Sequence, residues 1–159
     1  MLTHFNYWLT GYGWAEAFFT NEKREIRFEF SYLSDPLTDL IASLLKLISG
    51  SQNEANVDFF DEPGHYRLTL TMVENVNLRL ELRSWAESEG IADIAKELET
   101  SKLLFELTDT LKNVCSVVYA GILDLKNRHT EGEYFEQWVN YPFPIAKFKL
   151  FEQEVSKII

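Results

Sequence analysis

The sequence predicts an α+β fold in which an antiparallel sheet of about five strands packs against helices. In the N-terminal half, apolar and polar residues alternate between short turn-forming segments, which is typical of β-hairpins. One segment with helical spacing interrupts these strands, and the C-terminal half repeats apolar residues at helical spacing. Because strands come first and helices later, without β-α-β alternation, we expect the sheet to be antiparallel.

The expected strands form two hairpins and one further strand. The first hairpin turns at Gly11-Tyr12-Gly13, which aromatic-rich runs flank on both sides. The third strand has the clearest alternation, with Ile26, Phe28 and Phe30 on one face. The second hairpin follows the turn at Glu62-Pro63-Gly64. The expected strands are 5–10, 14–20, 26–32, 66–72 and 76–82.

A helix is expected to begin at Asp35-Pro36, because aspartate can cap free N–H groups and proline suits the first helical position. Its apolar residues recur at helical spacing as far as Ile48, and Gly50 is a natural stop. The polar segment 51–59 is expected to be a loop. Further helices are expected over 91–98, 104–129, 132–138 and 145–158.

The composition indicates one globular domain over residues 1–159. Apolar residues make up 46% of the chain and aromatic residues 14%, which a disordered chain would lack. Cys115 is the only cysteine, so the chain can form no internal disulfide. The N-terminal residues lack a secretory signal, and the most apolar stretch is too short to span a bilayer, so a cytoplasmic location is expected.

The net charge of −10 is concentrated in the middle third of the chain. Residues 51–100 hold 11 acids and 4 bases, a net charge of −7. Such a surface repels nucleic acid and attracts a basic protein, although charge runs often serve only solubility. Tyr134 stands among further acids and is a candidate aromatic anchor. The candidate partner-binding residues are Asp58, Asp61, Glu62, Glu87, Glu89, Asp93, Glu97, Glu131, Glu133 and Tyr134.

Catalytic, cofactor and metal motifs are not found in the sequence. His65 closely follows Glu62, so acid–base or metal chemistry is conceivable there, but a solvated turn that opens a strand is the favoured interpretation. Cys115 lies among valines on an expected helix, which indicates a buried thiol and not a nucleophile. The arginines of the expected strands share their faces with glutamates, which favours cross-strand charge pairing.

Several short motifs resemble those of bacterial immunity proteins from polymorphic toxin and contact-dependent growth-inhibition systems. They are Gly11-Tyr-Gly-Trp-Ala15, Ser31-Tyr-Leu-Ser-Asp-Pro-Leu37, Asp61-Glu-Pro-Gly-His-Tyr66, Tyr134 to Trp138, and Tyr141-Pro-Phe-Pro144. The resemblance implies a cytoplasmic, non-enzymatic protein that binds and occludes a toxin's effector domain, often a nuclease. Two other functions stay open: a small-ligand-binding or enzymatic domain with a pocket near His65 and Glu62, and a general protein–protein adaptor.

Overall fold

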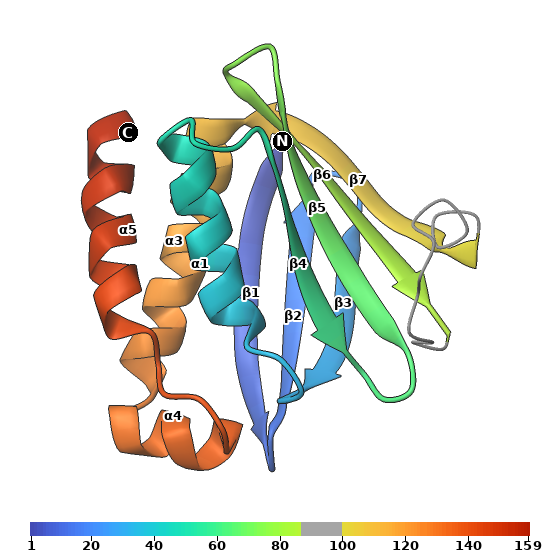
Figure 1. Ribbon diagram of the computed structural model, residues 1–159, viewed down its shortest axis with the longest axis vertical. Coiled ribbons are helices and arrows are strands. Elements are labelled where there is room, and N and C mark those ends of the chain that lie inside the picture. The colour runs from blue at the N-terminus through green and yellow to red at the C-terminus, as the bar shows by residue number, and fades with distance from the viewer. Residues whose placement is uncertain (87–99) are drawn as a thin grey trace.

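The computed structural model describes residues 1–86 and 100–159 and contains one seven-stranded antiparallel sheet (Figure 1). The strands lie side by side in chain order, and helices gather on one side of the sheet. The strands are β1 (Leu2–Gly11), β2 (Trp14–Asn21), β3 (Glu25–Ser31), β4 (Glu54–Phe60), β5 (His65–Val73), β6 (Asn77–Trp85) and β7 (Lys102–Thr110). The helices are α1 (Pro36–Ile48), α3 (Leu111–Arg128), α4 (Glu131–Trp138) and α5 (Ile145–Ile158).

The predicted α+β class and the antiparallel sheet are confirmed, but the prediction of about five strands is wrong. The segment 51–59, expected to be a loop, contains most of β4. The expected helix 104–129 is divided, because its first residues form β7 and α3 begins only at Leu111. The expected helix 91–98 lies outside the described residues.

Physical reasons for both differences are visible in the structure. In β4, Ala55, Val57 and Phe59 are buried while the polar residues between them face away from the core, so this polar segment still has one apolar face. In the second case, the Thr110 hydroxyl accepts a hydrogen bond from the Asn113 N–H and caps α3 at its first turn. The strand β7, which ends at this cap residue, pairs with β6.

The other helices begin and end close to the predicted positions. Helix α1 starts at Pro36, and Gly50 follows its end with a φ of +72°. Asp35 occupies the N-cap position, but its carboxylate makes no cap hydrogen bond and instead accepts one from the Thr38 hydroxyl. The prediction that Asp35 caps the helix through its side chain is therefore wrong.

The core lies between the sheet and the helices. Helix α1 packs on β4, α3 packs along β1, and α5 covers both helices. At Gly121, an added Cβ would lie 2.2 Å from the Phe5 carbonyl oxygen, so only glycine permits this close approach of α3 to β1. On the outward face, Arg27 pairs with Glu16 and Glu25. The expected charge pairing of strand arginines is confirmed there.

Candidate partner-binding surface

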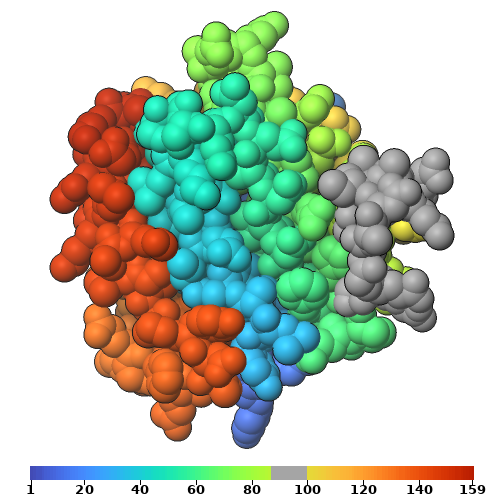
Figure 2. Space-filling view, viewed as in Figure 1, coloured from blue at the N-terminus to red at the C-terminus, as the bar shows by residue number. Residues whose placement is uncertain are grey.

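Four segments far apart in the sequence meet at one end of the sheet (Figures 1 and 2). They are the β1–β2 turn (11–13), the β3–α1 link (32–35), the β4–β5 turn (61–64) and α4 with Val139, and we call them the loop end. The Gly13 N–H donates to the Gln137 carbonyl oxygen at 2.9 Å, and the Tyr32 N–H donates to the Gly13 carbonyl oxygen at 2.8 Å. These bonds join the turn, the link and the helix into one surface.

The β1–β2 turn presents one large side chain to solvent. Gly11, Tyr12 and Gly13 all have positive φ angles, of +96°, +58° and +78°. A Cβ at Gly13 would lie 2.3 Å from the Tyr32 ring, so glycine is required there for packing as well as for backbone geometry. Tyr12 is 94% exposed at the tip. The turn therefore displays an aromatic ring on a tightly fixed backbone.

Helix α4 has one buried face and one exposed face. Thr130 and Glu133 form a capping box that fixes the start of the helix. Tyr134 and Trp138, one turn apart, face inward and are buried. Phe135 lies four residues after Glu131, on the adjacent face, and is half exposed. The helix thus places an aromatic side chain beside a carboxylate on the surface.

Val139, the residue after the end of α4, is a further exposed apolar residue near Phe135 in the sequence. It is exposed and follows Phe135 by four residues. Its φ angle of +79° is rare for a β-branched residue and costs energy. Such strain is retained when the surrounding structure holds it, and here the Val139 N–H donates to the Phe135 carbonyl oxygen at 2.8 Å. The end of α4 is therefore fixed in an unusual conformation at the surface.

The loop end combines exposed apolar side chains with a single sign of charge. Its four exposed apolar residues are Tyr12, Leu33, Phe135 and Val139. Its four segments contain no lysine or arginine. They contain six acids, of which Asp35 and Asp61 are half-buried and the exposed ones are Glu62, Glu131, Glu133 and Glu136. Large apolar groups surrounded by like charges are costly to leave in water and are typical of surfaces that bind a partner.

Buried polar side chains support this surface from inside. The Trp138 indole packs edge-on against Tyr7 and Phe30, with ring centroids 6.5 and 6.2 Å apart. Burial raises the pKa of Asp35, although the Thr38 hydroxyl partly opposes the rise. Burial also raises the pKa of Tyr7, and the nearby Tyr134 and Asp35 raise it further. The loop end therefore rests on a set of aromatic and acidic groups held in the interior.

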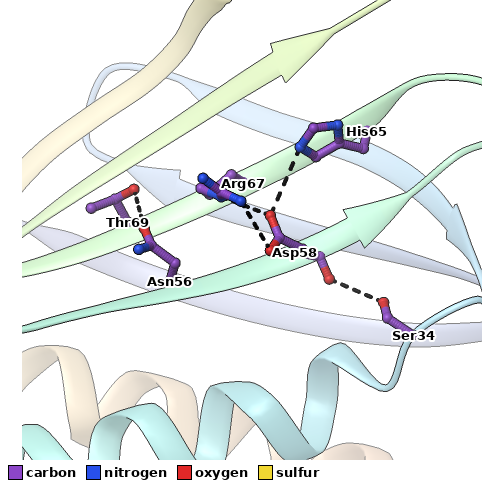
Figure 3. Close-up of polar contacts among 6 residues, drawn as sticks. All are labelled: Ser34, Asn56, Asp58, His65, Arg67 and Thr69. Atoms are coloured by element: carbon purple, nitrogen blue, oxygen red, sulfur yellow. Dashed lines mark hydrogen bonds and ion pairs between the residues drawn. The ribbon is translucent and has the colours of Figure 1, made fainter. Parts of the chain in front are cut away.

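Asp58, the first of the predicted partner-binding residues, is engaged within the sheet (Figure 3). Arg67 donates from Nε and Nη2 to its two carboxylate oxygens, at 2.8 and 3.3 Å. The His65 Nε2 atom lies 3.8 Å from Asp58 Oδ1. Beside them, the Thr69 hydroxyl donates to the Asn56 side-chain oxygen at 2.7 Å. Asp58 is thus part of a polar strip on β4 and β5, where its carboxylate is paired and partly exposed.

The structure separates the remaining predicted residues. Glu62 and Glu131 are exposed, whereas Asp61 is half-buried within the β4–β5 turn. Glu133 is exposed, but its carboxylate accepts a hydrogen bond from the Thr130 N–H, and its contacts with Thr130 lower its pKa. Tyr134 is 1% exposed, so its ring belongs to the core and not to the surface. Glu87, Glu89, Asp93 and Glu97 lie outside the described residues.

His65 opens β5, as the favoured interpretation holds, but it is buried and not solvated. Its ring stacks on Trp85 at 4.5 Å between centroids, nearly parallel. A pocket of about 400 Å³ lies nearby, and Asp61, Tyr66 and Lys102 are among its lining residues. Neither His65 nor Glu62 is among the described residues that line it. This pocket therefore does not bring His65 and Glu62 together among the described residues.

Other kinds of site receive little support from the described residues. Within residues 1–86 and 100–159, no group of three or more histidine, cysteine, aspartate or glutamate residues could hold a metal ion. In the same ranges, no helix combines the length and apolarity needed to cross a bilayer. Cys115 is buried, and burial raises the pKa of its thiol to about 12, so it is a poor nucleophile at neutral pH.

From the aromatic residues of 134–141, Phe135 among them, the sequence led to Tyr134 as the anchor, and it gave no expectation for the exposed Tyr12, Leu33 and Val139 of the loop end. For Tyr12 a signal exists, because a residue between two turn glycines has no room to enter the core. For Phe135 the signal is the helical period, since Tyr134 and Trp138 share one face and leave Phe135 on the next. Leu33 gives no such signal, because it lies in a link without periodicity.

Comparison with protein-family models, with curated proteins and with solved structures gives no match. No residue role can therefore be transferred from another protein. The loop end is the part of the described structure where exposed apolar side chains, acidic residues and a fixed backbone coincide.

Proposed function

We propose that this chain is a non-enzymatic inhibitory protein that binds a basic toxin domain, of nuclease type, through the loop end and occludes it. The observation that carries this proposal is the placement of Tyr12 and Phe135 on a surface whose segments hold six acids and no base. The aromatic side chains supply contact area, and the carboxylates supply attraction and orientation.

Electrostatics favours a basic partner with a phosphate-binding site. Nucleases bind a polyanion, so their active sites carry lysine and arginine side chains. Glu62, Glu131 and Glu136 are exposed and make no ion pair with a described residue, so their charges are available to such a partner. An acidic protein bound there covers the surface that would otherwise hold nucleic acid. The motifs that resemble immunity proteins also gather at this end, since Gly11–Gly13, Tyr32–Asp35 and Asp61–Gly64 belong to it.

Affinity capture followed by a growth assay tests this function. The intact chain is used to capture proteins from its native host, and each captured basic domain is then expressed with and without the chain. We expect one captured domain to arrest growth alone and the chain to restore growth. Its isolated activity, measured as cleavage of RNA or DNA, should fall when the chain is added in equimolar amount.

Two other outcomes have definite meanings. A captured partner whose activity is unchanged when bound indicates an adaptor and contradicts the inhibitory function. A captured partner with an acidic binding surface would be repelled by the loop end, and one with a neutral surface would gain little attraction from it. Either partner would contradict the proposal that opposite charges bring the two proteins together. As a control, a variant with Tyr12→Ala and Glu131→Lys should capture less of the same partner.

A further inference from the structure

A second pocket is lined by residues from the end of α3 and the beginnings of α4 and α5. Figure 1 shows where these helices lie on the helical side of the molecule. This pocket has a volume of about 380 Å³, within the usual range of small-molecule sites. Its apolar part is formed by Leu125, Tyr134, Phe143 and Ile145. Leu125 and Tyr134 are almost fully buried, and the Tyr134 and Phe143 rings meet edge to face at 5.5 Å. These rings form the fixed base of the pocket, and the apolar surface open to a ligand comes from the half-buried Ile145 and the edge of Phe143.

Basic side chains gather around the same pocket. Lys126, His129 and Lys149 line it from α3, from the residue after α3, and from α5. Among the described residues, none of the three has an ion-pair partner in the structure, as is also the case for most described lysines. In a chain with a net charge of −10, two lysines and a histidine around one pocket form a local basic cluster.

Helix electrostatics explains only part of this arrangement. Lys126 lies in the last turn of α3, where the helix dipole favours a cation. Lys149 lies in the N-terminal half of α5, where the dipole offers no such benefit. The only carboxylate among the described lining residues is that of Glu131, which offsets part of the positive charge. The surplus of positive charge thus needs a further reason.

We propose that this pocket binds a small amphipathic organic acid, with its apolar body against Ile145 and the edge of Phe143 and its carboxylate toward Lys126 and Lys149. Apolar burial holds the body, and the lysines satisfy the charge where it leaves the apolar surface. This inference does not rest on the proposed function, because it needs no protein partner, although the pocket adjoins the loop end and shares Glu131 with it.

Titration of the intact chain with hexanoate, followed by amide NMR, tests the site. We expect saturable shifts confined to residues around the pocket, with a dissociation constant on the order of 1 mM, as a ligand of this size allows. Hexan-1-ol, which has the same apolar body without charge, should bind more weakly by about threefold to tenfold. Acetate, which has the charge without the body, should show no saturation in the same range.

Matched variants on two helices sharpen the test. Lys126→Met and Lys149→Met should each weaken hexanoate binding about threefold to tenfold, and Glu131→Gln should strengthen it. Lys147→Met changes the same residue type on α5 outside the described pocket lining and should leave binding unchanged. An unchanged amide spectrum confirms that each variant folds. Absent saturation, equal binding of hexan-1-ol, or equal effects of Lys147→Met and Lys149→Met would overturn the proposal.

Discussion

The chain reverses direction at both ends of the sheet, yet the two ends differ in charge and in exposed apolar side chains. The three connections of the opposite end, 21–24, 49–53 and 74–76, hold two acids and two bases. Asn21 stabilises the first of them locally, because its side-chain oxygen accepts hydrogen bonds from the N–H groups of Lys23 and Arg24. The loop end has six acids, no base and four exposed apolar side chains. Chain reversal does not require these features, half of the acids belong to α4, and the proposed function takes their concentration at one end as a binding surface.

The largest expected effect concerns Trp138, the buried residue that attaches α4, and with it the loop end, to the core. Trp138→Ala should lower the free energy of unfolding by about 3–5 kcal/mol, because it removes a fully buried indole from its contacts with Tyr7 and Phe30. Chemical denaturation measures this loss. Hydrogen exchange should also show selective loss of protection at the Gly13 amide, which donates to Gln137 on α4.

Leu47→Ala in the last turn of α1 is the matched variant toward the opposite end, because Leu47 is also buried. It should lower global stability by about 2–5 kcal/mol while the Gly13 amide loses no more protection than the rest of the core. If the two variants lowered the protection of the Gly13 amide equally, Trp138 would not be the residue that attaches the loop end to the core.

A smaller effect is expected from the glycines of the two ends. Gly13 and Gly50 have similar positive φ angles, of +78° and +72°. Gly13→Ala should destabilise the fold more than Gly50→Ala, by about 1–3 kcal/mol, because its Cβ would meet the Tyr32 ring while Gly50 faces open space. Thermal unfolding of both variants measures the difference. Equal losses would mean that the Tyr32 ring moves aside freely and that the loop end is less rigid than the structure indicates.

The smallest expected effect is a pH dependence carried by Asp35. Burial raises its pKa above the ordinary value of 3.8, so the folded state holds this proton more tightly than the unfolded state. As pH rises from 3.8 through the raised pKa, stability should therefore fall. Asp35→Asn should remove this fall, while Glu22→Gln in an exposed turn of the opposite end should keep it. Parallel stability profiles for wild type and Asp35→Asn would contradict the burial of this charge.

The sequence predicts a segment correctly where local interactions determine its structure, and it fails where contacts with distant residues do. The β1–β2 hairpin and α1 could be predicted because glycine geometry and helical periodicity act locally. Strand β7 could not, because Leu104, Leu107 and Leu111 continue at helical spacing into α3, and pairing with β6 overrides that pattern. Thr110 was the available signal, since it caps α3.

For the candidate surface, the acidic segments could be found in the sequence, but the residues that contact them in the fold could not. Asp58 is paired because Arg67 lies directly opposite it on β5, and a cross-strand register cannot be read from charge alone. Tyr134 is buried because α4 turns that face toward Tyr7 and Asp35, which are distant in sequence. The loop end is assembled from four separate segments, so only the fold brings its apolar and acidic residues together.

The most direct test of the loop end is the affinity of the captured partner for paired variants of the two ends. Tyr12→Ala with Phe135→Ala, and separately Glu131→Lys with Glu136→Lys, should each weaken binding at least about tenfold, with the charge reversals acting mainly through slower association at low salt. Val76→Ala, which removes an exposed apolar side chain, and Glu22→Lys with Glu74→Lys should change binding less than about twofold. Equal losses from both ends, or a larger loss from the opposite end, would contradict the loop end as the binding surface.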